Sequence, residues 1–159
     1  MEPRFETFTD KTLVGKRLTM SFNNNRTRDL WQSFMPYRAD ILANTGTDLY
    51  SVEVYKPHFF DHFDPAAEFE KWAAVQVSNI DSLPPGMEAL LIPAGLYAVF
   101  TYKGPASQGQ KIYRYIFTTW LPGSGYELDD RPHFALMGPK YKHEDPSSEE
   151  EMWIPVKKT

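Results

Sequence analysis

HFDPAAEFEKW at residues 62–72 and HEDPSSEEEMW at residues 143–153 share the pattern His-x-Asp-Pro-x-x-Glu-x-Glu-x-Trp, 81 residues apart. A repeat with a period of about half the chain predicts a duplicated half-domain rather than a solenoid of many short units. Each copy delivers an acidic residue and a tryptophan into the start of an expected strand. These pairs are Glu70 with Trp72 and Glu151 with Trp153.

The repeat continues on both sides of this motif as four elements in the same order: strand, helix, strand, strand. Each predicted helix is an apolar stretch stopped by a proline, which cannot continue a helix interior. The expected strands are 13–20, 49–55 and 70–77, then 96–102, 131–137 and 150–156, with helices at 27–35 and 110–121 and a short extra strand at 87–93. We expect one domain, 1–159, with half-repeats 12–79 and 87–157, a linker at 80–86 and a loose lead-in at 1–11.

Composition limits the possible functions. The chain has 159 residues, a net charge of −4 and no cysteine. No basic face for a phosphate backbone is evident, and disulfides, thiol chemistry and cysteine metal sites are excluded. Because no run of 18 apolar residues and no signal-like apolar segment exists, we expect no membrane association. The sequence predicts a cytoplasmic protein with no cofactor and no direct nucleic-acid binding.

One pair of histidines is a candidate metal site. His58 and His62 are four residues apart, close to Asp61 and Asp64. A metal site needs convergent ligands held by a fixed second shell of contacts. Only His62 has a counterpart in the second copy of the motif, so we expect a turn or packing role and no metal.

A strand-helix-strand-strand unit covers one face of its sheet with the helix and leaves the other face bare. Two copies related by a pseudo-twofold axis can cover these bare faces by facing each other. In the last strand, Met152, Ile154 and Val156 share the parity suited to the helix side, and Glu151 and Trp153 take the other parity. We therefore expect an α+β fold with antiparallel sheets, and both Glu–Trp pairs pointing into a groove between the halves.

An acid beside tryptophan in a groove has a definite chemistry. Burial raises a carboxyl pKa, and an aromatic wall with a carboxylate attracts an organic cation. The same site suits a flat apolar ligand, and a carboxyl with a raised pKa can act as a general base on water. The alternative is that each glutamate is solvated and each tryptophan fills core.

Six further motifs spread over most of the chain: PGME at 85–88, IPAGLYAVF at 92–100, KG at 103–104, IFTTWLP at 116–122, GYEL at 125–128 and EMWIPV at 151–156. In these motifs the chain resembles the GyrI-like small-molecule-binding domain, which is the effector-binding domain of AraC-type and MerR-type drug-responsive regulators. The resemblance implies the tandem fold described above and an acidic residue of the last strand in an aromatic-walled pocket. That acid corresponds to Glu151, or to Glu150 if the strand register is shifted by one. A separate DNA-binding region of the regulators has no counterpart in this chain.

Three functions remain open. The first is a standalone binding protein for cationic or apolar drug-like molecules, whose candidate ligand-binding residues are Glu151, Trp153, Trp72, Glu70, Trp120, Tyr97 and Tyr55. The second, implied by the resemblance, is a hydrolase that opens cyclopropane-bearing natural products, with Glu151 as the base and Tyr97 or Tyr55 as the acid. The third is an inhibitory protein with a regulator or DNA gyrase as its partner, for which the acidic loop 144–151 is a candidate surface.

Overall fold

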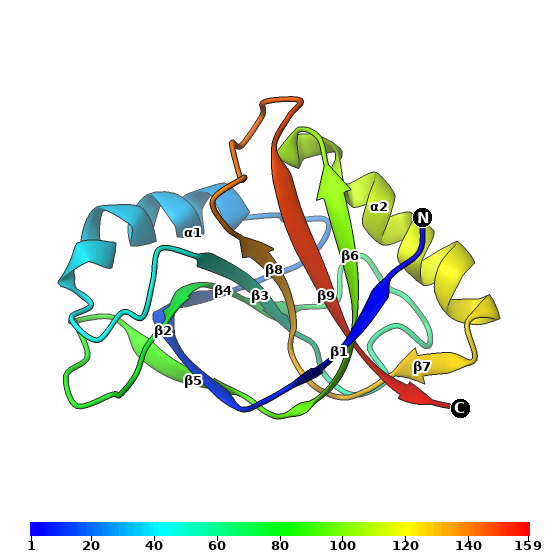
Figure 1. The fold of residues 1–159 in the computed structure, drawn as a ribbon, viewed down its shortest axis with the longest axis horizontal. Helices are drawn as coiled ribbons and strands as arrows, with labels where there is room; N and C mark the ends of the chain where they lie inside the picture. The colour runs from blue at the N-terminus through cyan, green and yellow to red at the C-terminus, as the bar shows by residue number, and fades with distance from the viewer.

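The computed structural model describes residues 1–159 and shows an α+β fold with nine strands and two helices (Figure 1). The first part of the chain forms β1 (Arg4–Phe8), β2 (Lys11–Met20), α1 (Thr27–Phe34), the 3-10 turn η1 (Met35–Asp40), β3 (Leu49–Val54) and β4 (Phe69–Gln76). The second forms β5 (Glu88–Ile92), β6 (Gly95–Lys103), the turn η2 (Ala106–Gln108), α2 (Gly109–Tyr115), the π turn η3 (Ile116–Trp120), η4 (Leu121–Gly123), β7 (Tyr126–Leu128), β8 (His133–Met137) and β9 (Glu149–Lys158).

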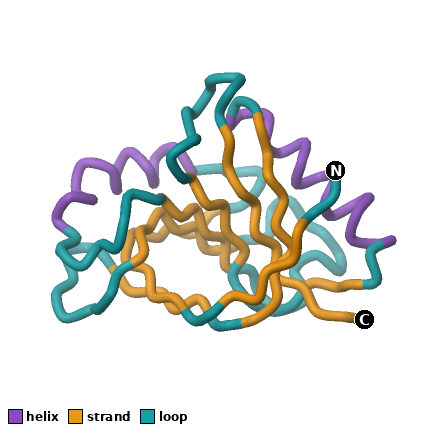
Figure 2. Tube along the Cα trace, in the orientation of Figure 1, coloured by secondary structure: helices purple, strands orange, loops and turns teal.

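All nine strands belong to a single antiparallel sheet in the order β1-β6-β9-β8-β3-β4-β2-β5, with β7 paired to β9. The order strand, helix, strand, strand therefore occurs twice, in β2-α1-β3-β4 and in β6-α2-β8-β9. The two halves meet where β3 pairs with β8, through Leu49↔Met137 to Glu53↔His133. The halves thus share one continuous sheet (Figure 2).

The N-terminal residues correct one expectation. The loose lead-in predicted at 1–11 is instead strand β1, which pairs with β6 from Arg4↔Val99 to Phe8↔Gly95. The stretch carries little apolar signal, because Phe8 is the only buried residue among its five residues. The three-residue strand β7 was also not predicted.

The inner face of the curled sheet holds an aromatic core. Phe8 of β1 lies 5.5 Å from Phe134 of β8 and 5.7 Å from Trp153 of β9, measured between ring centroids. Because β6 and β9 separate β1 from β8 in the sheet order, this contact requires the sheet to curl over itself. Leu13 of β2 and Ile92 of β5 are fully buried in the same cluster.

Both helices cover the outer face of this sheet, on opposite flanks (Figure 1). Leu30 and Phe34 of α1 pack on Ala73 and Val75 of β4. In the second half, the helix side of β9 packs against Ile116, as its parity predicted; the strand residues concerned are Met152, Ile154 and Val156. No helix is long and apolar enough to span a membrane.

We predict that Phe8→Ala lowers the free energy of unfolding by about 3–5 kcal/mol, because it removes a buried ring that joins β1 to the inner core. Urea denaturation measures the loss. Phe5→Ala on the same strand is the matched control: Phe5 faces the other side and is 42% exposed, so its loss should be about 1 kcal/mol or less. Equal losses in both variants would show that β1 does not close the core.

Candidate functional site

The two Glu–Trp pairs of the repeated motif both lie on the inner side of the sheet. Trp153 donates its indole N–H to Glu151 Oε1 at 3.1 Å, so these two side chains share a face. Trp153 also stacks on Phe134, with ring centroids 5.3 Å apart. Trp72 is only 4% exposed, within the same aromatic core. Packed rings, rather than the expected groove, occupy this face, because β1 and β5 supply side chains that fill it.

Tyr97 belongs to this packed face as well. It is completely buried, donates its hydroxyl to the Pro132 carbonyl at 2.7 Å, and lies under the Arg131 guanidinium at 4.6 Å from the ring centroid. Burial raises the pKa of Tyr97 to about 12, a shift that the charge of Arg131 opposes. The hydroxyl is therefore a protonated structural donor in this conformation.

The protein itself supplies a cation to each acid of the motif. Arg4 lies 2.7 Å from Glu151, and its guanidinium is 5.9 Å from the Trp153 ring. Arg17 pairs with Glu70 and, at 2.8 Å, with Glu88, while lying 5.9 Å from the Trp72 ring. These arginines occupy the positions relative to carboxylate and ring that an organic cation would take.

A second polar cluster lies on the outer face of the sheet. Glu53 of β3 stands directly opposite Lys71 of β4 on one side and His133 of β8 on the other. The Glu53 side chain is about 10% exposed and that of Lys71 12%, with Lys71 Nζ 3.3 Å from Glu53 Oε2. Glu53 Oε2 nonetheless has no aligned hydrogen-bond donor. A buried carboxylate that is only partly satisfied is costly, so this position needs an explanation.

Glu150 of β9 adds a second acid to this cluster. Burial raises the pKa of Glu150, the charge of Lys71 opposes the shift and the charge of Glu53 adds to it. Burial likewise raises the pKa of Glu53, and Lys71 opposes that shift. Lys71 pairs with Glu53, whereas Glu150 makes no ion pair. The outer cluster therefore holds two acids, Glu53 and Glu150, and one cation, Lys71.

Aromatic side chains surround these charges. Tyr55 meets the His133 ring edge to face at 4.9 Å and the Phe60 ring at 4.8 Å. Phe60 stacks on Phe117 of η3 at 4.8 Å, so the segment between β3 and β4 reaches across to the second half. Tyr113 of α2 completes the wall; burial raises its pKa well above the usual value, as do the charges of Glu53 and Glu150.

The structure thus separates the seven residues that the sequence singled out. Five lie on the inner side, namely Glu70, Trp72, Tyr97, Glu151 and Trp153. Tyr55 borders the outer cluster, and Trp120, the last residue of η3, packs on Phe100 with ring centroids 5.1 Å apart. Sequence reasoning missed Glu53, Lys71, His133 and Tyr113, although a glutamate between Val52 and Val54 in a predicted strand was a usable signal.

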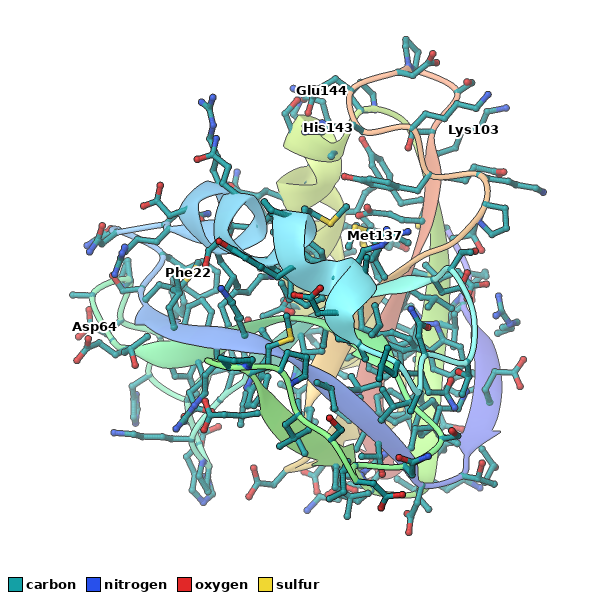
Figure 3. The ribbon with its side chains drawn as sticks, turned by 90° about the vertical axis from the view of Figure 1, so that its left-hand side faces the viewer. Phe22, Asp64, Lys103, Met137, His143 and Glu144 are labelled. Atoms are coloured by element: carbon teal, nitrogen blue, oxygen red, sulfur yellow. The ribbon has the colours of Figure 1, made fainter.

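The histidines considered for metal binding lie at the surface. His58 Nδ1 is 2.8 Å from Asp61 Oδ2, and both side chains are more than 60% exposed. Figure 3 shows His143 and Glu144 of the second motif beside the beginning of α2, and Asp64 of the first motif well away from them. Asp64 and Asp145 each accept a backbone N–H two residues ahead, which fixes a turn in each copy.

Comparison with known proteins fits this architecture. A family model described as the GyrI-like small molecule binding domain matches residues 1–157. The transcriptional regulator BrlR of Pseudomonas aeruginosa is 26% identical over 147 residues, which cover 91% of this chain and 52% of BrlR. The chain therefore spans about half the length of that relative.

Two solved structures share the fold. SAV2435 bound to tetraphenylphosphonium has a TM-score of 0.74 at 20% identity, covering 99% of this chain and 94% of SAV2435. EcmrR, in a complex with DNA, has a TM-score of 0.70 at 16% identity, covering 99% of this chain and 58% of EcmrR. The fold and the matched model define a small-molecule-binding domain. The chain belongs to the GyrI-like family.

The buried imidazole of His133 predicts acid sensitivity. Burial lowers the pKa of His133 to about 3, and the charge of Arg131 adds to the shift. Below the unfolded pKa of about 6.5 the unfolded chain binds a proton that the folded protein excludes, so stability falls as the pH falls. His133→Phe should reduce the stability loss between pH 7 and pH 4 by about 3 kcal/mol in urea denaturation.

The matched control is His62→Gln, which removes an exposed histidine outside the core. An identical loss of stability in His133→Phe and wild type would show that His133 is accessible to protons in the folded protein.

Proposed function

We propose that this chain binds bulky organic cations at the outer cluster formed by Glu53, Lys71, Glu150, Tyr55 and Tyr113. The observation that carries the proposal is the unpaired acid Glu150, held next to a second acid and inside an aromatic wall. Organic cations bind where aromatic faces and a carboxylate converge out of water. The pairs on the inner face lack a free acid, since Arg4 and Arg17 occupy them.

The charges of the outer cluster favour a ligand that carries one positive charge. Lys71 pairs with Glu53 and leaves one carboxylate, Glu150, to be neutralised by a ligand. A monovalent cation then balances the site, whereas an anion would meet two carboxylates. Burial raises the pKa of Glu150, which means that its ionised form is less stable in the protein than in water. A bound cation would offset this loss of hydration.

The wall suits a ligand that is not flat. Its rings meet at steep angles, 84° between Tyr55 and His133 and 71° between Tyr55 and Phe60. Such a wall presents faces in several directions, which matches a cation with groups projecting around its charge. Phe60 covers the cluster by stacking on Phe117, so we propose that it moves aside when a ligand enters. The segment that carries it is exposed at His58 and Phe63, and exposed segments open at a lower free energy than the core.

The comparisons support the proposal without supplying the residues. The family is described by small-molecule binding, and SAV2435 carries tetraphenylphosphonium in its solved structure. BrlR is a regulator, and this chain corresponds to about half of it. We propose that the chain contributes ligand sensing in the cytoplasm and makes no direct contact with nucleic acid, in keeping with its net charge of −4.

The test compares two neighbouring glutamates of β9 that point to opposite faces of the sheet. Glu150→Gln should weaken tetraphenylphosphonium binding at least about tenfold, because a partly buried carboxylate no longer faces the cation. Glu151→Gln should leave the affinity within about twofold, since Glu151 is paired with Arg4 on the inner side. Isothermal titration calorimetry on the full chain gives both dissociation constants.

The outcomes separate the alternatives. Loss of binding in Glu151→Gln alone would return the site to the inner face and overturn the proposal. Mass spectrometry of mixtures with cyclopropane-bearing compounds reports hydrolysis: consumption that Glu150→Gln abolishes would make the same cluster a hydrolase site. If folded wild type neither binds cations nor consumes such compounds, a protein partner such as a regulator or gyrase replaces the small-molecule function.

A further inference from the structure

A surface cleft of about 430 Å³ lies beside the C-terminal end of α2, and none of the residues of the cluster around Glu150 lines it. It is formed where the N-terminal strand passes the end of that helix and meets β7. Its lining includes Glu2, Phe5, Tyr115, Thr119, Trp120 and Tyr126. The volume falls within the range of small-molecule sites. We propose that this cleft is a second binding site, for flat aromatic cations.

Tyr126 lies nearly parallel to two other rings of the cleft, whereas Phe5 and Trp120 are tilted by 41° to each other. Phe5 stacks on Tyr126 with centroids 4.9 Å apart and planes inclined by 28°. Trp120 is inclined by only 14° to Tyr126, at 6.5 Å. A planar aromatic ligand can stack on the exposed faces of these rings, because offset stacking is a favoured arrangement of aromatic systems. In the outer cluster, by contrast, Tyr55 meets both His133 and Phe60 edge to face.

Phe5 is an exposed aromatic residue at the edge of the cleft. Its ring is 42% exposed, while Phe8 on the opposite side of β1 is 5% exposed and already anchors the strand. The Tyr115 hydroxyl donates to the Met1 carbonyl at 3.2 Å and holds the N-terminal residues against the end of α2. The structure thus fixes an exposed aromatic face at the mouth of a cleft.

The charge of the cleft specifies the ligand. Glu2 is the only charged side chain in the lining, and no arginine or lysine pairs with it. The Thr119 hydroxyl is exposed in the same wall and is available to a polar substituent. A delocalised planar cation satisfies both features, since ring faces and a carboxylate attract positive charge together.

The experiment titrates the full chain with proflavine, a flat aminoacridine cation, and follows fluorescence anisotropy. Glu2→Gln and Phe5→Ser should each weaken proflavine binding about two- to fivefold, the range expected for one exposed charge or ring contact. Glu127→Gln is the matched control. It removes an exposed glutamate of β7 that pairs with Lys157 outside the lining, and it should bind as wild type does. The anionic 9-anthracenecarboxylate should bind more weakly than proflavine.

Three results would overturn the proposal. Wild type that does not bind proflavine has no such site. Equal affinity in wild type, Glu2→Gln and Phe5→Ser places the dye elsewhere. Loss of binding in Glu150→Gln with Glu2→Gln unchanged assigns the dye to the outer cluster, which would refute the cleft and leave the proposed function standing. Thermal unfolding of each variant confirms that it is folded.

Discussion

The pairing of β3 with β8 is the constraint on which the candidate site depends. This ladder is the place where the two halves join, and its register puts Glu53 directly opposite His133. The next ladder puts Glu53 opposite Lys71. A shift of one residue between β3 and β8 would turn Val52 or Val54 toward α2 and place Glu53 in the aromatic core. The site is therefore a property of the joined sheet and belongs to neither half alone.

The buried charges at this junction need compensation that the structure supplies only in part. The Glu53–Lys71 pair is shielded from water, and one carboxylate oxygen lacks an aligned donor. Replacing such a pair by apolar residues often costs little or nothing in stability, so stability does not account for it. Carboxyl groups with shifted pKa values, buried among aromatic side chains, are more typical of functional sites. The inner pairs contrast with them, because Arg4, Arg17, Glu70 and Glu151 remain partly exposed.

The sequence predicted the fold better than the site, because apolar patterns report which residues are buried and do not report which distant residues become neighbours. Alternation and helical periodicity reproduced both helices and most strands, because burial of an apolar face dominates these patterns. The parity of Glu151 and Trp153 was also readable from the sequence, and the structure places both on one face. What the pattern could not reveal was that β1 and β5 fill that face, or that Arg4, more than 140 residues away, pairs with Glu151. Such long-range neighbours depend on how the sheet curls.

The positions where the two motif copies differ carry more information about function than those where they agree. Lys71 corresponds to Met152, and Glu150 corresponds to Phe69, so each copy contributes one charge where the other contributes an apolar side chain. The shared Glu–Trp positions serve both halves alike, as expected for packing and surface ion pairs. Because the differing positions meet on the outer face, the asymmetry brings Lys71 of one copy and Glu150 of the other into the same cluster.

The loops that precede β4 and β9 also differ between the two copies of the motif. In the second copy, Glu144 accepts hydrogen bonds from Ser107 N and Oγ at 2.9 and 2.7 Å, which ties its loop to the start of α2 in its own half. In the first copy, Phe60 crosses to Phe117 of the other half and covers the cluster. A loop fixed by hydrogen bonds serves as a support. A loop held by stacked rings can exchange its aromatic contact for that of a ligand without leaving a polar group unpaired, which is the property a cover over a small-molecule site requires.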